Sequence, residues 1–316
     1  MKLLFLARHD SGDNDDEGAV AHAFRVLGHT VVRVQERRKH RSQAWPDVLR
    51  LADACDWCLC FKHPVVSELQ DLSRHTKLAF WHFDLIDGTF DPTLAERSRS
   101  RIRWMDDVVP LCRVGFCTDG SWVARWNADR QRNGLPVAEL VHLPQGADER
   151  VTGPGKPTHL VTPVLFTGMV QHGQDRAAHV RHLKETFNGQ FAVFGDSQRD
   201  RLHGRDLADL VASTQILIAP DGPGNDLYWS NRVYLTTGFR GFLLHPYASR
   251  LARDYLPGDH MQFYVSREHL DQLVRYYLDR PDKARELAEA GYKRCLEANL
   301  YRHRVEKMVT IFEGLS

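Results

Sequence analysis

Two glycine- and proline-rich stretches, Pro144-Gln-Gly-Ala-Asp148 and Thr152-Gly-Pro-Gly-Lys-Pro157, divide the sequence near its middle. Clustered Gly and Pro between two regions of regular hydrophobic patterning are typical of a linker. The chain has 316 residues, which is long for one compact domain. We therefore predict one domain over residues 1–148 and a second over residues 149–316, and we allow the last helix to pack back on the first domain.

On both sides of the linker, short apolar runs alternate with segments of helical spacing. In the first half we expect strands and helices in turn over Lys2–Ala7, Gly18–Leu27, Thr30–Val34, Trp45–Ala54, Asp56–Phe61, Val65–Ser73 and Lys77–Phe83. In the second half the alternation covers Pro163–Thr167, Asp175–Glu185, Gln190–Phe194, Leu207–Ser213, Gln215–Ala219, Asn231–Thr237 and Gly241–His245, and the remainder is mostly helical. Strands separated by helices imply parallel crossovers, so each half is predicted to be an α/β domain with a Rossmann-like sheet.

The composition is that of an ordinary globular protein, with 42% apolar residues, 26% charged residues and a net charge of +1. No apolar run approaches the roughly 18–20 residues that span a bilayer. The apolar start, Met1–Ala7, is stopped by Arg8, so we interpret it as a buried strand and not as a signal peptide. We therefore expect a cytoplasmic protein without a membrane span.

Three of the six cysteines, Cys55, Cys58 and Cys60, lie close together near His63. A structural zinc site needs four ligands and usually a second paired cluster, which the sequence does not offer. Cys58 and Cys60 also alternate with apolar neighbours, as in a buried strand. We therefore interpret them as core thiols and expect no metal site.

Two segments of the second half have the character of phosphate-binding loops. Residues Thr167–Gly173 (TGMVQHG) follow a predicted strand and precede a helix, and Arg176 comes next. Residues Asp221–Arg232 (DGPGNDLYWSNR) also follow a strand and open a helix. Ligands of doubly wound sheets bind at the carboxyl ends of the strands, so both loops are candidates for holding a nucleotide and its diphosphate. An ordinary strand-to-helix turn stays an equal alternative for the first loop.

The segment Ser230–Pro246 (SNRVYLTTGFRGFLLHP) resembles the C-terminal domain of CgeB-like glycosyltransferases, as does Tyr301–Val305 (YRHRV). Pro144–Asp148 is similar to the interdomain element of that family, and Val164–Arg176 to its first C-terminal strand and loop. The resemblance covers roughly residues 140–312. It implies the GT-B fold, in which two Rossmann-like domains face each other across a cleft.

The resemblance also implies metal-independent transfer of a sugar from a nucleoside diphosphate sugar, for which we favour a UDP-sugar. No further cofactor is expected. The predicted donor-binding residues are Gly168, Arg176, Gly195, Asp221, Tyr228, Ser230, Asn231 and Arg232. One position departs from the family pattern, because no Glu follows Arg232 to bind the ribose. Asp221, Asp226 or backbone groups are the alternatives for that role.

The catalytic base is expected in the first half, where we select His9, Asp10 and Asp84 at the ends of predicted strands. Partial burial would raise the pKa of Asp84 towards that of a useful base, and helix capping is its equal alternative. His9 is also explained as a plain loop residue. The sequence Asp13-Asn-Asp15-Asp16 is similar to the metal-binding motif of the other glycosyltransferase fold, GT-A, but its place in the first loop favours a solvated acidic loop.

Two basic clusters, Arg37–Arg41 and the alternating Arg97, Arg99, Arg101 and Arg103, are explained either as solvated surfaces or as a surface for a polyanion. The predicted acceptor-binding residues are Arg37, Arg38, Arg41, Arg99 and Arg101. Modified (hydroxymethylated) DNA and a polysaccharide are the candidate acceptors. A sugar-nucleotide epimerase of the same fold and a non-catalytic nucleotide-sugar-binding protein are the alternative functions.

Overall fold

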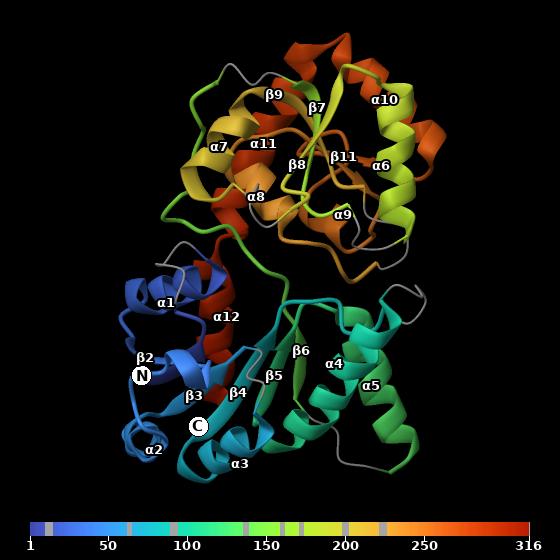
Figure 1. Cartoon of the computed structure of the whole chain (residues 1–316). Helices are drawn as coiled ribbons and strands as arrows, with labels where there is room; N and C mark the ends of the chain where they lie inside the picture. Colours follow the sequence, from blue (N-terminus) through green and yellow to red (C-terminus); the bar gives the residue numbers. More distant parts are fainter. Residues whose placement is uncertain are drawn as a thin grey trace. The chain divides into compact units, whose positions relative to one another are not determined.

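The computed structural model describes residues 1–9, 15–61, 65–88, 94–134, 139–158, 162–170, 174–197, 202–220 and 226–315. The chain divides into two compact units (Figure 1). Unit 1 contains Met1–Phe90, Ala95–Gln145 and Tyr301–Ser316, and unit 2 contains Asp91–Leu94 and Gly146–Leu300. The end of the chain therefore belongs to the same unit as its beginning.

Unit 1 is built on a parallel sheet. Its described strands are β1 (Lys2–Ala7), β2 (Thr30–Gln35), β3 (Trp57–Cys60), β4 (Lys77–His82), β5 (Val114–Cys117) and β6 (Leu140–His142). They lie in the order β2-β1-β3-β4-β5-β6, and every described pair is parallel, with Leu4 opposite Val32 on one side and Cys58 on the other. The chain moves outward from β1 to β2 and then returns to β3. The boundary between β1 and β3 is thus a topological switch point, where ligands of such sheets bind.

Helices cover both faces of this sheet (Figure 1). Leu3 and Phe5 point to the face covered by α1 (Asp16–Val26) and α12 (Tyr301–Gly314), while Leu4 and Leu6 point to the other face. That second face is covered by α2 (Trp45–Asp53), α3 (Val66–His75), α4 (Ala95–Val108) and α5 (Gly120–Arg132). Two short 3-10 helices, η1 (Arg38–His40) and η2 (Val109–Leu111), complete the unit. The alternation of side chains along each strand fills both core layers, as expected for a sheet buried on both faces.

The last helix, α12, is an integral part of unit 1 and lies beside α1 (Figure 1). The ring of Phe312 stacks on Trp57 with 4.3 Å between centroids. The Tyr301 hydroxyl donates to Oδ1 of Asp16 over 2.7 Å, and Nε of Arg304 donates to the carbonyl of Gln145 over 3.0 Å. Apolar packing and these polar contacts together fix α12 on the sheet.

Unit 2 has a second parallel sheet. Its described strands are β7 (Thr162–Thr167), β8 (Phe191–Phe194), β9 (Thr214–Ile218), β10 (Leu243–Pro246) and β11 (Gln262–Tyr264). They lie in the order β11-β10-β9-β7-β8, so the switch point falls between β7 and β9. The helices are α6 (Gln174–Thr186), α7 (Gly204–Ala212), α8 (Arg232–Gly238), α9 (Leu251–Asp254), α10 (Arg267–Leu278) and α11 (Pro281–Ala298). Two hydrophobic clusters, one on each face, enclose this sheet.

Most elements agree with the sequence predictions. The start of the chain is a buried strand, as predicted, and burial raises the pKa of the thiols of Cys58 and Cys60 on β3. The chain after His245 is mostly helical, as predicted, but Gln262–Tyr264 pairs with β10 as β11, a strand that the sequence analysis did not predict. Three residues are too few to show a strand period. Within the described residues, no helix has the length and apolar character to cross a bilayer.

Candidate functional site

Arg232 lies at the carboxyl end of β7, at the switch point of unit 2. It is the first residue of α8 and is 91% buried, with a relative exposure of 9%. Its Nε donates to the carbonyl of Thr167 over 2.9 Å, and one Nη donates to Oγ of Ser230 over 3.0 Å. Its guanidinium carbon lies 4.8 Å from the centroid of the Phe166 ring. These contacts hold the cation against the loop that follows β7.

Arg176 approaches the same ring from α6. Its guanidinium carbon lies 5.8 Å from the Phe166 centroid, and one Nη donates to the carbonyl of Met169 over 3.2 Å. We call Arg176 and Arg232 the guanidinium pair. Because a planar guanidinium donates paired hydrogen bonds to phosphate oxygens, the pair suits a diphosphate.

The backbone conformation at position 168 and the nearby Arg232 side chain together require a glycine there. Its φ is +135°, which side-chain-bearing residues rarely adopt, and its N–H donates to the carbonyl of Phe194 over 2.8 Å. A Cβ on Gly168 would lie 2.8 Å from an Nη of Arg232. A larger residue would therefore displace the buried guanidinium.

The structure thus brings Gly168, Arg176, Ser230 and Arg232 together, although they are distant in the sequence. The other predicted donor-binding residues are placed as follows: Gly195 is buried directly after β8, Tyr228 is half-buried before α8, and Asn231 is the residue before α8. Asp221 lies outside the described residues. Asp226 accepts a hydrogen bond of 2.9 Å from the Ser249 amide, which gives this carboxylate a role in the fold. A ribose contact by Asp226 would have to use its other oxygen.

At the carboxyl edge of the sheet in unit 1, two of the three predicted catalytic residues are described. Nε2 of His9 lies 3.2 Å from the carbonyl of Phe5, so the proton is assigned to Nε2 and the ring is tied to β1. Asp84 follows β4, and one of its oxygens lies 3.1 Å from an Nη of Arg101. Helix capping does not explain Asp84, because α4 begins only at Ala95. Asp10 lies outside the described residues.

Asp119, which sequence reasoning missed, fixes the loop that holds Asp84. It is fully buried, and Oδ2 accepts hydrogen bonds of 3.0 and 3.2 Å from the amides of Ile86 and Asp87. Its other oxygen caps α5 at the Trp122 amide. A carboxylate directly after a strand and three residues before a helical Trp is a capping signal that the sequence does offer.

Glu17 is a second residue that the sequence analysis missed. Burial, followed by the charges of Asp15 and Asp16, raises its pKa to about 8. The interpretation of residues 13–16 as a solvated acidic loop was wrong for the described Asp15 and Asp16. Asp15 caps α1 through the Gly18 amide, and Asp16 accepts from Tyr301. A titratable carboxyl at a switch point is typical of functional sites, although structural clusters also shift pKa values.

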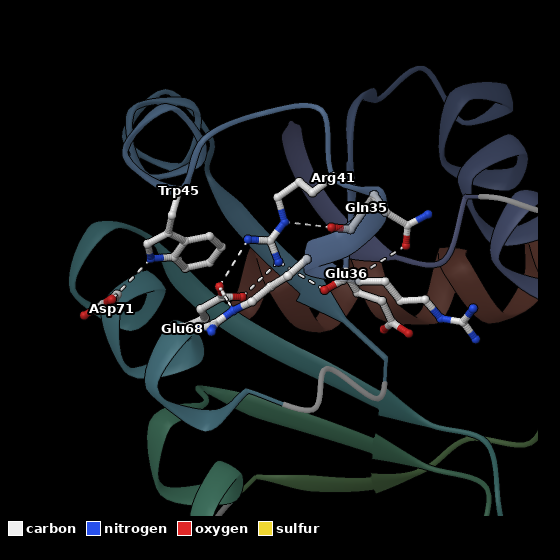
Figure 2. Close-up of polar contacts among 8 residues, drawn as sticks. Gln35, Glu36, Arg41, Trp45, Glu68 and Asp71 are labelled. Atoms are coloured by element: carbon white, nitrogen blue, oxygen red, sulfur yellow. Dashed lines mark hydrogen bonds and ion pairs between the residues drawn. The ribbon is translucent and has the colours of Figure 1, made fainter.

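The basic cluster Arg37–Arg41 is only partly available to a ligand. The Arg41 side chain is 4% exposed and forms an ion pair of 2.9 Å with Glu68, which is itself buried (Figure 2). Its Nε and one Nη donate to the carbonyls of Gln35 and Glu36, and its guanidinium lies 4.8 Å from the Trp45 ring (Figure 2). We therefore withdraw Arg41 from the acceptor-binding residues, because its donors hold the loop after β2.

Arg101 is also withdrawn from the predicted acceptor-binding residues, because its donors contact other parts of the protein. One Nη donates to the carbonyl of Leu85 over 2.6 Å and the other contacts Asp84, so Arg101 holds the loop after β4. Arg38 keeps a 63% exposed side chain while its Nε donates to Glu68, and Arg37 is half-buried. Arg97, Arg99 and Arg103 are exposed on α4. Among the described residues, no group of three or more His, Cys, Asp and Glu side chains is arranged to hold a metal ion.

Comparisons with known proteins agree with this architecture. The sequence family described as glycosyl transferase-like matches residues 176–310, which is less than half of the chain and includes both members of the guanidinium pair. No curated protein sequence matches the chain. Solved structures match over nearly its whole length.

Three of these structures illustrate the likeness. An alpha-glucosyltransferase in complex with UDP and a 13-mer DNA containing an HMU base has a TM-score of 0.71 at 8% identity, with 99% of each chain covered. Sucrose-phosphate synthase from Thermosynechococcus elongatus has a TM-score of 0.63 at 10% identity, covering 100% of this chain and 99% of its own. Anabaena HepE in complex with UDP and glucose has a TM-score of 0.61 at 10% identity, covering 99% of this chain and 100% of its own.

The chain has the GT-B fold. The structural likeness at these identities concerns the fold alone. Together with the family match in the second half, it supports a glycosyltransferase. The GT-A alternative is therefore wrong, and the finer resemblance to CgeB-like proteins stays a prediction.

Proposed function

We propose that this GT-B protein is a glycosyltransferase that moves a sugar from a nucleoside diphosphate sugar to an acceptor hydroxyl. The observation that carries the proposal is the guanidinium pair beside Gly168 at the switch point of unit 2. Two cations held against the same ring at the carboxyl end of β7 suit a leaving diphosphate, whose charge grows as the sugar–phosphate bond breaks. The match to the glycosyl transferase-like family over residues 176–310 supports this proposal.

UDP is the nucleotide that we propose for the donor. The structures of HepE and of the alpha-glucosyltransferase both contain UDP, and both share the fold of this chain. Arg176, Arg232 and Gly168 would hold the diphosphate. Gly195, Tyr228, Ser230 and Asn231 stay candidates for the other parts of the donor.

The reaction joins the acceptor oxygen to the anomeric carbon of the sugar and breaks the bond from that carbon to the diphosphate. The acceptor hydroxyl loses its proton, and the nucleoside diphosphate leaves with the bonding electrons. We propose that Asp84, His9 or Asp10 of unit 1 takes this proton. Asp84 suits this role best of the described residues, because Arg101 and the loop fixed by Asp119 hold its carboxylate in one place.

We propose that the transfer needs no divalent metal. The charge that a metal would neutralise on the diphosphate is assigned here to the guanidinium pair. The acceptor is proposed to be modified DNA or a polysaccharide. One neighbour in fold is an alpha-glucosyltransferase bound to DNA with an HMU base, which supports including the first.

A thermal-shift panel with UDP, GDP, TDP, CMP and their sugars tests the donor site. A ligand at 100 times its Kd stabilises the fold by about 2.7 kcal/mol, which raises the Tm by a few degrees. We expect a shift with UDP that Arg176→Gln reduces strongly. The matched control is Arg181→Gln, an exposed arginine of the same helix, which should leave the shift unchanged.

Each other outcome points to a different function. Hydrolysis of a UDP-sugar without acceptor supports a transferase, whereas inversion of the sugar without transfer would indicate an epimerase. Nucleotide binding without either reaction would indicate a binding protein. An undiminished shift in Arg176→Gln would show that the nucleotide does not use the guanidinium pair.

A further inference from the structure

We propose that unit 1 binds the phosphate backbone of a nucleic acid along the carboxyl edge of its sheet. The contacts would come from Arg38 and Lys39 on η1 and from Arg97 and Arg99 on α4. The inference rests on the proposed function in one respect, since a nucleic acid bound here would be the acceptor. Binding itself does not depend on sugar transfer and is tested separately.

The first observation is that three of these cations have no acidic partner among the described residues, while Arg38 contacts Glu68. Lys39, Arg97 and Arg99 are exposed, and none of them forms an ion pair within the part of the chain that the structure describes. Three exposed arginines elsewhere in unit 1, Arg50, Arg74 and Arg132, each contact an Asp three residues earlier on α2, α3 and α5. Lys39, Arg97 and Arg99 differ from these three in keeping their positive charge open to a ligand.

The second observation is the order of charges along α4. Its first turn holds one acid, Glu96, but Arg97 and Arg99 follow in the N-terminal half and Asp106 and Asp107 lie near the C-terminal end. The helix macrodipole favours the opposite arrangement, with acids first and cations last. The helices α2, α3 and α5 do carry basic residues in their last turns. The arginines of α4 thus oppose helix stability, which fits a role in binding.

The third observation places the start of α4 at the carboxyl edge of the sheet. The helix follows β4 through a loop, and Arg101 donates to the carbonyl of Leu85 within that loop. Oγ of Ser98 accepts from the Gly88 amide over 2.8 Å. These contacts hold the first two turns of α4 next to the residues that end β4. Arg97 and Arg99 are therefore fixed near Asp84.

The fourth observation is that η1 is preorganised. Arg41 ties both ends of the loop together through the carbonyls of Gln35 and Glu36 and the carboxylate of Glu68 (Figure 2). Arg38 donates its Nε to Glu68 and leaves most of its side chain exposed. A ligand that binds Arg38 and Lys39 therefore has little loop entropy to overcome.

The two basic positions flank the switch point of unit 1. The order β2-β1-β3-β4 puts the ends of β2 and β4 three strand spacings apart, which is about 14 Å. The major groove of B-DNA is about 12 Å wide. Cations on each side can thus contact two backbones. The planar guanidinium groups of Arg97 and Arg99 can also donate paired hydrogen bonds to phosphate oxygens, which favours nucleic acid over other polyanions.

The carboxylates at the same edge do not oppose this binding strongly. Glu36 pairs with Arg8 at 2.9 Å, Asp87 pairs with Arg125 at 2.7 Å, and Asp84 contacts Arg101. The raised pKa of Glu17 keeps most of this carboxyl neutral at pH 7. Glu96 in the first turn of α4 is exposed and is the exception. The other acids named here are thus largely compensated, whereas Lys39, Arg97 and Arg99 keep their charge for a ligand.

Fluorescence anisotropy of the whole chain with labelled 20-mer duplex and single-stranded DNA tests the inference at salt concentrations from 50 to 200 mM. We expect the variant Lys39→Gln, Arg97→Gln, Arg99→Gln to bind about tenfold or more weakly at 50 mM salt. Its slope of log affinity against log salt should be shallower by about 2.7 for the duplex, because three phosphate contacts are lost. The matched control replaces Arg50, Arg74 and Arg132 by Gln, which removes the same charge at the opposite edge.

Equal losses in both triple variants would overturn the inference, because net charge alone would then explain binding. Binding of heparin without binding of DNA would overturn it in favour of a polysaccharide. No binding of either would also reject it. If UDP still stabilises the chain in those cases, the donor site stands and only the acceptor surface is wrong.

Discussion

The two switch points have the same strand order and opposite charge. In unit 2, the carboxyl ends of β7 and β9 are accompanied by Arg176 and Arg232. In unit 1, the end of β1 is followed by Asp15, Asp16 and Glu17 at the start of α1. The shared topology gives each unit a place for a ligand, and the side chains give that place its chemistry. A basic site suits a departing diphosphate, and an acidic site suits the removal of a proton.

The charged side chains of the two units are also held in place by different kinds of contact. The loops of unit 1 are fixed by ion pairs in which both charges are satisfied, such as Arg41 with Glu68. The guanidinium pair of unit 2 is held by carbonyls, a hydroxyl and the Phe166 ring. The printed contacts of these side chains thus use ion pairs in the loops of unit 1 and neutral groups at the switch point of unit 2. Four changes test this difference, beginning with the largest expected effect.

Arg41→Ala should lower the free energy of unfolding by about 3–5 kcal/mol, because it leaves the buried Glu68 without its main partner. Urea unfolding measures the loss. The exposed pair of Arg50 with Asp47 is the control, and Arg50→Ala should cost less than about 1 kcal/mol. A similar small cost for both variants would mean that Arg41 does not hold the loop after β2.

Glu17→Gln should change the pH dependence of stability. The folded-state pKa is about 8 against an ordinary value of 4.5, so the folded state binds the extra proton between these pH values. Stability therefore falls as the pH rises from about 4.5 to about 8, and the variant lacks this loss. At pH 9 the variant should be more stable than the parent by about 2–4 kcal/mol, with no difference at pH 4.

Urea unfolding at five pH values between 4 and 9 measures this effect. Glu306→Gln, an exposed acid on α12, is the control and should follow the parent at every pH. Parallel curves for the parent and Glu17→Gln would show that Glu17 titrates as an ordinary carboxyl.

Gly168→Ala should weaken UDP binding about 10- to 100-fold, or about 1.4–2.7 kcal/mol, because the new Cβ displaces Arg232. Isothermal titration calorimetry gives the Kd. Gly189→Ala is the control, since Gly189 also has a positive φ but a Cβ there meets nothing within 4 Å. Both variants should lose stability through backbone strain, and only Gly168→Ala should lose UDP affinity. An unchanged Kd in Gly168→Ala would place the diphosphate elsewhere.

EDTA should have the smallest effect. If the guanidinium pair supplies the charge for the leaving diphosphate, then hydrolysis of the UDP-sugar should change by less than about twofold when metals are removed. Readdition of Mg²⁺ or Mn²⁺ provides the control. A loss that either metal restores would mean that a metal, and not the guanidinium pair alone, neutralises the diphosphate.

The fold was predicted largely from local patterns. The apolar run Lys2–Ala7 reveals a strand because a sheet buried on both faces needs continuous apolar residues, and the β-branched run Thr30–Val34 reveals the edge strand β2. The strand β11 was missed because three residues carry no period. The roles of the charged residues were harder to predict, because the sequence does not show whether a charged side chain faces solvent or a buried partner.

The arginines of unit 1 illustrate this limit. Arg38, Lys39 and Arg41 are close neighbours in the sequence, yet Lys39 is exposed and Arg41 is enclosed by Glu68 and Trp45. Arg41 and Glu68 are separated by 27 positions. The ion pair of Arg41 with Glu68 forms only because α3 packs beside the loop that follows β2, and a sequence pattern does not show this packing.

The sequence by itself determined two α/β halves, the linker between them and the loops that end the strands of the second half. These features follow from hydrophobic periodicity and from the backbone demands of Gly and Pro, which are local properties. The tertiary structure alone decided that Arg176 and Arg232 share the Phe166 ring, that Gly168 must lack a side chain, and that Arg41 is structural. Those contacts join residues from separate elements, so their energies exist only after the chain has brought the elements together.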